Sequence, residues 1–319
     1  MKNTHDISVV VPVYGCAETL YELVNRLDEC FRQHSLEYEV ILVDDRSRDN
    51  AWDVIKQLSC ENKKVKGIRF SNNFGQHYAI SAGLEAANGN WCVVMDCDLQ
   101  DPPEEIIKLY NKAQEGFDIV MAKRDVRKGS IFEKITSLLF HAVFNLLTDM
   151  KVDNRLASFG ICSNKVVKNI IRYREKDRAF GYLTLLVGFA RAEIVVRQAQ
   201  RGSGKTSYNF SSRMHLALSH ILSHSNKPLM LVIQLGFFLS SIGVMYGIWL
   251  IMRYLVWGQQ IEGWTSVIVS LYLLVGLLIL VIGVVGVYVG KIYSETKNRP
   301  LFIIDEVTNH RPVENIFSK

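Results

Sequence analysis

Residues 93–103 read VVMDCDLQDPP, an apolar run that ends abruptly in three acidic residues and two prolines. The apolar and β-branched residues from Trp91 to Met95 follow Asn88-Gly89-Asn90 and predict a buried strand. Carboxylates at the carboxyl end of such a strand lie where open α/β sheets bind their ligands. Asp96 and Asp98 are two residues apart, so their side chains point to the same side of an extended chain.

A divalent cation suits this pair of carboxylates. Oxygen-only ligation is typical of Mg²⁺ or Mn²⁺ shared with substrate phosphates, and not of zinc. The alternative is a solvated acidic loop before a helix that starts at Pro102-Pro103. An isolated Asp-x-Asp favours that alternative, whereas further acidic strand ends in the same chain favour the metal.

Two more apolar runs end in polar loops. Residues 7–13 lead to Tyr14-Gly15 and Glu18, and residues 40–43 lead to Asp44 and Asp45. Strands are expected at residues 7–13, 38–44, 65–70, 91–96 and 118–123, with helical patterns between them. This alternation predicts a largely parallel α/β sheet in which the loops after strands one, two and four share a crevice. Acidic loops there suit a nucleotide, and the absence of Gly-x-Gly-x-x-Gly and Walker lysine motifs disfavours dinucleotide oxidoreductases and P-loop NTPases.

An ordered set of motifs resembles family 2 glycosyltransferases, in particular the polyprenyl-phosphate branch typified by dolichyl-phosphate mannose synthase. The motifs are VPVY at 11–14, VDDRSRD at 43–49, NFGQ at 73–76, SAGL at 81–84, MDCDLQDPP at 95–103, RGSGKTSY at 201–208 and SHSNKPL at 223–229. Each motif alone is weak evidence, but together they cover nearly the whole chain. The resemblance implies a GT-A fold, which is a Rossmann-like nucleotide-sugar domain, followed here by a two-helix transmembrane hairpin.

The resemblance also implies roles for individual residues. The nucleotide would be bound by Pro12, Tyr14, Glu18, Asp44, Asp45 and Asn73. Asp98 would be the chief metal ligand, with Asp96 and Gln100 completing or orienting the site. Arg124 and Arg127 would meet phosphate oxygens, and Arg201 and Lys205 would close over the diphosphate or the lipid phosphate. Guanidinium groups fit phosphate geometry, although each basic residue taken singly can also be a solvated charge.

The chain departs from the family pattern in three places. Arg46 stands where many relatives carry a glycine, and Asn72 where many carry a basic residue. The segment 157–162 lacks an Asp that others place near the acceptor phosphate. A phosphate monoester, with a second pKa of about 6, is already largely anionic and needs aiming more than deprotonation. An alcohol acceptor would need a base, so the missing Asp favours a lipid phosphate.

Two uncharged apolar segments, 229–252 and 265–290, each exceed the roughly 20 residues that cross a bilayer core. Lys205, Arg213 and Lys227 precede the pair, and Lys291, Lys297 and Arg299 follow it. The positive-inside rule therefore predicts cytoplasmic ends and an external connector. Amphipathic patterns at 131–147 and 210–222 fit either core packing or helices at the bilayer surface.

Composition limits the remaining possibilities. The net charge is +5, and the basic residues are dispersed, so a nucleic-acid partner is not expected. The six cysteines form no Cys-x-x-Cys pair and are expected to be reduced thiols, without a disulfide framework or a zinc site. The expected organisation is a cytoplasmic catalytic domain at 1–208, an amphipathic juxtamembrane helix at 209–227, two transmembrane helices at 228–293 and a cytoplasmic tail at 294–319.

The sequence thus predicts an inverting, Mg²⁺- or Mn²⁺-dependent glycosyltransferase at the inner membrane, expected to be a homo-oligomer. It would move a sugar from a UDP- or GDP-linked donor to a polyprenyl phosphate such as undecaprenyl phosphate, for cell-wall or O-antigen synthesis. One alternative is the same fold acting on a glycan or a lipid alcohol. Another is a non-catalytic membrane protein that binds a nucleotide sugar. The identity of the sugar stays open.

Overall fold

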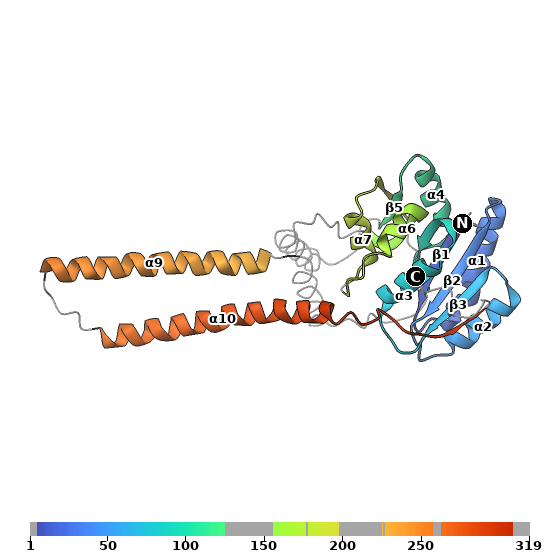
Figure 1. Ribbon diagram of the computed structural model, residues 1–319. Helices are drawn as coiled ribbons and strands as arrows, with labels where there is room; N and C mark the ends of the chain where they lie inside the picture. Colours follow the sequence, from blue (N-terminus) through green and yellow to red (C-terminus); the bar gives the residue numbers. More distant parts are fainter. Residues whose placement is uncertain are drawn as a thin grey trace. The chain divides into compact units, whose positions relative to one another are not determined.

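The computed structural model describes residues 5–124, 156–176, 178–197, 225, 227–257 and 263–308. The chain divides into two units. The first comprises Met1–Ser130, Asp153–Thr206 and Arg299–Lys319, and the second comprises Ile131–Val152 and Ser207–Asn298. The described part of the first unit is an α/β sheet with helices, and that of the second consists mainly of two long helices (Figure 1).

Within the described residues, eight strands form one sheet in the order β7-β5-β6-β4-β1-β2-β3-β8. Their bounds are β1 His5–Val13, β2 Tyr38–Asp44, β3 Val65–Phe70, β4 Gly89–Val94, β5 Ile119–Arg124, β6 Leu156–Ser163, β7 Arg191–Val196 and β8 Ile304–Val307. β1 pairs in parallel with β2 and β4, β2 with β3, and β5 with β7. β6 is antiparallel to β4 and β5, and β8 is antiparallel to β3. The predicted α/β class is therefore confirmed, as a mixed sheet.

Helices cover both faces of the sheet. One face packs against α1 (Leu20–Gln33), α2 (Ala51–Glu61) and α4 (Ile106–Gln114), and the other against α3 (Gln76–Ala86), α6 (Asn164–Ile170) and α7 (Phe180–Leu186). Short 3₁₀ turns, η1 (Ala17–Thr19) and η2 (Pro103–Glu105), precede α1 and α4. Side chains of a strand alternate between its faces, so Val9 and Val11 of β1 join the first core and Val10 joins the second.

The five expected strands are present, with ends that differ by no more than two residues. β6, β7 and β8 were not predicted. In β6, a Cβ at Gly160 would lie 2.6 Å from Sδ of Met121, so glycine permits close packing where the sequence pattern suggests a break. β8 comes from the segment expected to be a tail.

A buried polar network joins the four central strands at their amino ends. The Glu39 carboxylate accepts hydrogen bonds from the Ser8 hydroxyl (2.6 Å), the Asn88 backbone N–H (2.7 Å) and the Lys66 ammonium. Burial alone would raise the pKa of Glu39, but these hydrogen bonds hold the pKa below its usual range. A shift of one residue between these strands would break the network. The network therefore fixes the register of the four strands, and with it the positions of their carboxyl ends.

The second unit contains α9 (Lys227–Trp257) and α10 (Trp264–Thr296). The stretches Leu229–Leu250 and Val267–Thr296 are long and apolar enough to cross a membrane, which confirms the expected pair of apolar helices. Their large side chains are exposed, with Phe237 at 77% and Tyr272 at 74%. The Tyr288 hydroxyl of α10 donates to the Ser225 carbonyl, just before α9 (2.9 Å). The expected amphipathic segments, 131–147 and 210–222, lie outside the described residues.

Candidate active site

Three loops gather at the carboxyl edge of the sheet. β1 lies between β2 and β4 and runs parallel to both, with Val13 opposite Asp44 and Val10 opposite Val94. The loops that follow these strands therefore start at the same edge, as the sequence predicted. Glu18, Asp44, Asp45, Asp96 and Asp98 lie in or next to these loops.

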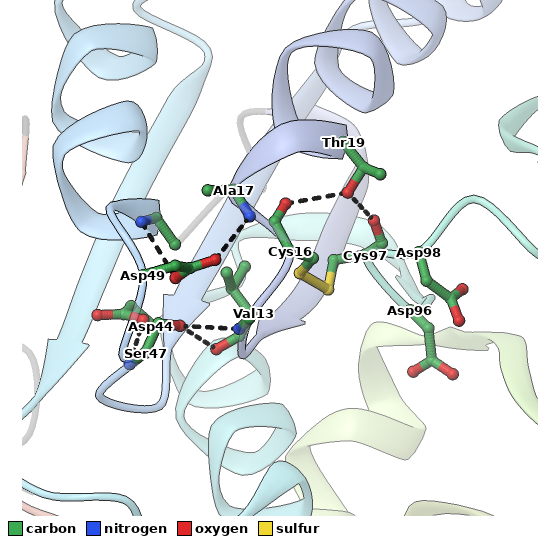
Figure 2. Close-up of a disulfide and its surroundings, with 12 residues drawn as sticks. Val13, Cys16, Ala17, Thr19, Asp44, Ser47, Asp49, Asp96, Cys97 and Asp98 are labelled. Carbon is green, nitrogen blue, oxygen red and sulfur yellow. Dashed lines mark hydrogen bonds between the residues drawn. A yellow bond between two sulfur atoms is a disulfide. The ribbon is translucent and has the colours of Figure 1, made fainter. Parts of the chain in front are cut away.

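The loop after β4 carries the expected metal-binding residues. Asp96, Asp98 and Gln100 are partly exposed, and in Figure 2 the two carboxylates project from the loop toward the same side. Oδ1 of Asp96 accepts a hydrogen bond from Nε2 of Gln76 (2.7 Å), and Oδ1 of Asp98 accepts one from the backbone N–H of Gln100 (3.1 Å). Leu99 between them has a φ of 58°, so the chain turns sharply at this point.

This donor set fits a cation that arrives with its substrate. No group of three or more His, Cys, Asp and Glu side chains placed to hold a metal ion occurs in the described parts of the chain. Mg²⁺ is commonly bound by one or two carboxylates together with substrate phosphates and water, so Asp96 and Asp98 would be sufficient as protein ligands. Gln100 offers a further neutral oxygen. A closed four-ligand zinc site does not fit these residues.

The loop after β2 is built on buried carboxylates. The two oxygens of Asp45 accept hydrogen bonds from the backbone N–H groups of Phe74 (2.7 Å) and Gly75 (2.8 Å). Burial raises the pKa of Asp45 above its usual value, although these hydrogen bonds oppose the rise. Asp44 accepts the backbone N–H of Ser47 (3.0 Å) and lies 3.5 Å from Nε of Arg69. Asp45 thus joins its loop to the loop after β3, and Asp44 contacts its own loop and β3. The contact of both carboxylates with a nucleotide stays a prediction.

An open pocket of about 610 Å³ lies beside these loops. It is lined by Tyr14, Arg46, Ser47, Arg48, Asn72 and Asn73. Tyr14 and Asn73 were predicted to bind the nucleotide, whereas the two arginines were not included in the predicted site. Of the other predicted residues, Pro12 is buried in β1 and Glu18 is exposed on η1.

A disulfide between Cys16 and Cys97 joins the loop after β1 to the loop after β4 (Figure 2). The expectation that all six cysteines are reduced thiols is wrong for this pair. The two residues are 81 positions apart in sequence, but their strands are neighbours and their Cα atoms are 6.4 Å apart. The Thr19 hydroxyl reinforces the link, because it lies 2.7 Å from the Cys97 carbonyl oxygen and 3.0 Å from that of Cys16. Cys30, Cys60, Cys92 and Cys162 are free thiols.

The basic residues predicted to bind phosphate lie at the end of β5 or later in the sequence than the three acidic loops. Arg124 is the last residue of β5, opposite Val196 of β7. Because β6 is antiparallel to both β4 and β5, β5 ends at the same edge of the sheet as β4. Arg127, Arg201 and Lys205 lie outside the described residues.

Comparison with known proteins agrees with this architecture. The family model described as Glycosyl transferase family 2 matches residues 8–173, more than half of the chain. The bactoprenol glucosyl transferase of Shigella phage SfII is 34% identical over 307 residues, which cover 96% of this chain and 98% of the relative. The undecaprenyl-phosphate 4-deoxy-4-formamido-L-arabinose transferase of Shewanella sediminis is 31% identical over 312 residues, or 96% and 93% of the two chains.

A solved structure has a similar fold. Glucosyl-3-phosphoglycerate synthase from Mycobacterium tuberculosis, in complex with Mn²⁺, UDP and phosphoglyceric acid, superposes with a TM-score of 0.51 at 15% identity. The match covers 69% of this chain and 77% of that chain. With an α/β unit of GT-A type and a family match over more than half of its length, the chain belongs to glycosyltransferase family 2.

Proposed function

We propose that this enzyme is an inverting glycosyltransferase that moves a sugar from a nucleotide sugar to a polyprenyl phosphate. The observation that carries the proposal is the presence, in one chain, of a GT-A-type sheet with acidic loops at its carboxyl edge and of two exposed apolar helices. Two relatives named for polyprenyl acceptors align along 96% of the chain, helices included. The names of these relatives differ in the sugar and agree in the type of lipid. We therefore infer the class of acceptor for this chain, and not the sugar.

The donor would bind along the three acidic loops. Tyr14, Asn73 and the pocket arginines would meet the nucleotide, and Asp96, Asp98 and Gln100 would hold Mg²⁺ or Mn²⁺. When bound, the cation offsets the negative charge of the leaving nucleoside diphosphate. The Gln76 amide already holds the Asp96 carboxylate, which fixes one ligand before substrate arrives.

The acceptor phosphate would attack without a carboxylate base. At neutral pH a phosphate monoester, with a second pKa of about 6, is mostly dianionic. One of its oxygens forms a bond to the anomeric carbon while the bond to the diphosphate breaks on the opposite face, which inverts the configuration. β6 lies beside β4, and the eight residues Leu156–Ser163 include no acid. Arg124, Arg127, Arg201 and Lys205 are the proposed partners of phosphate oxygens.

The proposed location is the inner membrane, with both α9 and α10 crossing it and the catalytic unit in the cytoplasm. Lys291, in the C-terminal part of α10, and Lys297, directly after α10, support cytoplasmic chain ends. Reporter fusions before Met1 and after Lys319 should both report cytoplasm. A periplasmic signal from either end would contradict the topology.

The decisive experiment offers detergent-solubilised protein a panel of UDP- and GDP-sugars with undecaprenyl phosphate or, as the matched control, undecaprenol. We expect one donor to give a glycolipid with the phosphate and none with the alcohol. Equal transfer to undecaprenol would support the alcohol-acceptor alternative. Nucleotide-sugar binding without transfer to either lipid would support the non-catalytic alternative.

A further inference from the structure

The segment that follows α10 is built into the catalytic unit. α10 ends at Thr296, and β8 begins at Ile304 and extends the sheet beyond β3. The Thr308 backbone N–H donates to the Gly67 carbonyl (2.9 Å), and the Thr308 hydroxyl accepts the Gly67 N–H (2.8 Å). Phe302 stacks on Phe70 with ring centroids 5.1 Å apart. These contacts give β8 a defined place at the edge of the sheet.

One side chain of β8 reaches the pocket-lining loop. Nη1 of Arg46 donates to Oδ2 of Asp305 at 2.8 Å, and both side chains are 42% exposed. Arg46 lines the pocket together with Tyr14 and Asn73. A residue from the far end of the chain therefore holds a cation at the proposed donor site.

The backbone of Arg46 is also unusual. Its φ is 57°, in the left-handed region where a side chain is strained and glycine is the favoured residue. The residues on both sides fix this conformation, because Asp45 is bound to Phe74 and Gly75 and the Ser47 N–H is bound to Asp44. Strained residues that a structure holds in this way are concentrated at ligand sites. An arginine kept in such a position beside a pocket indicates a role for its guanidinium.

We propose that Asp305 is a positioning residue of the donor site, which holds Arg46 where its guanidinium contacts the donor nucleotide. A guanidinium carries five N–H groups, so the hydrogen bond to Asp305 leaves others for nucleotide oxygens. The inference rests on the proposed function for the class of ligand. By this proposal, the affinity for the donor depends on β8, the strand that follows α10 in the sequence.

Asp305→Asn is the test, because it keeps the shape of the side chain and removes its charge. The matched control is Glu306→Gln on the same strand. Glu306 accepts a hydrogen bond from Nε1 of Trp52 (3.0 Å) and pairs with Arg69 (3.4 Å), and neither partner lines the pocket. Dissociation constants for UDP and GDP, donor and acceptor KM, and kcat are measured on the full-length protein in detergent.

We expect Asp305→Asn to raise the nucleotide dissociation constant and the donor KM about two- to fivefold, the range for a half-exposed ion pair. The kcat and the acceptor KM should stay unchanged, and Glu306→Gln should behave as wild type. Arg46→Ala should weaken nucleotide binding about tenfold or more, since a charged hydrogen bond is lost. In that background, Asp305→Asn should add nothing, because it acts through Arg46.

Three outcomes overturn the role of Asp305 alone: unchanged nucleotide affinity in Asp305→Asn, an equal shift in Glu306→Gln, or full additivity with Arg46→Ala. A wild-type protein that binds neither UDP nor GDP would instead overturn the proposed function, and the role of Asp305 with it. The two failures are therefore distinguishable in the binding measurement on the wild-type protein.

Discussion

The loop after β2 is held in place by its own carboxylates, whereas the loop after β4 is held by a disulfide and a threonine hydroxyl. Asp45 accepts two backbone hydrogen bonds and is 3% exposed. In the β4 loop, Cys97 forms the covalent link to Cys16, and its carbonyl oxygen lies 2.7 Å from the Thr19 hydroxyl. Asp96 and Asp98 on either side of Cys97 are partly exposed.

From this difference we expect the two acidic pairs at this sheet edge to serve two purposes. A carboxylate that accepts buried backbone N–H groups stabilises the fold and is costly to remove. In the loop after β4, the uncharged disulfide and the Thr19 hydroxyl hold the chain in place. The carboxylates of this loop are therefore not needed for that structural role and can face a cation. Burial and anchoring, more than residue type, separate Asp44 and Asp45 from the pair proposed to bind metal.

Removal of the proposed metal site should have the largest effect. Asp98→Asn should lower turnover about 10³-fold, because a charged ligand facing the leaving diphosphate is lost, while the melting temperature stays unchanged. EDTA should abolish wild-type activity, and Mg²⁺ or Mn²⁺ should restore it. Asp53→Asn, on the exposed surface of α2, is the control. Undiminished transfer in EDTA would remove the metal from the mechanism.

Loss of the covalent anchor should come next. Cys16→Ser should lower the free energy of unfolding by about 2–4 kcal/mol, because the link restrains a long loop of the unfolded chain. Treatment of the wild-type protein with a dithiol should give the same loss, measured by chemical denaturation. Cys60→Ser, at an exposed free thiol, is the control. Alkylation of both Cys16 and Cys97 in the unreduced protein would show that the anchor is absent.

Asp45→Asn tests the other loop. The amide keeps one acceptor oxygen and turns an NH₂ donor toward a backbone N–H, so the free energy of unfolding should fall by about 2–3 kcal/mol. A lower melting temperature for Asp45→Asn, together with an unchanged melting temperature for Asp98→Asn, would support different roles for the two loops. If Asp45→Asn kept full stability and lost only nucleotide binding, the two pairs would have the same kind of role.

The smallest effect is expected at Gln76, which donates to Asp96. Gln76→Ala should raise the Mg²⁺ concentration for half-maximal activity about two- to tenfold, as one hydrogen bond that orients a ligand is lost. A metal titration at saturating donor measures this shift. Gln57→Ala, which removes an exposed hydrogen bond to Glu61 on α2, is the matched control. An unchanged titration curve would mean that Asp96 needs no orientation.

The sequence was sufficient to predict the first half of the fold, because β1, β2 and β4 contain apolar runs with clear polar ends, and β3 alternates buried apolar residues with Lys66 and Arg69. It also located the acidic edge, since parallel neighbours must end together. The contacts that hold the loops at that edge, such as Cys16–Cys97 and Arg46–Asp305, join residues far apart in the sequence. Nothing near Cys16 points to Cys97, and nothing near Arg46 points to Asp305. For the same reason, β8, with the short sequence Ile304–Val307, could not be recognised.

The antiparallel pairing of β8 with β3 sets an order of events during synthesis. Gly67 and Thr308 are 241 residues apart, so at 5–20 residues per second the partner of β3 leaves the ribosome roughly 10–50 s later. During that interval the edge of β3 is unpaired, and both apolar helices emerge before it is covered. The sheet is therefore completed only after the helices have been made, and a nascent chain stalled before β8 presents an open edge strand to its neighbours.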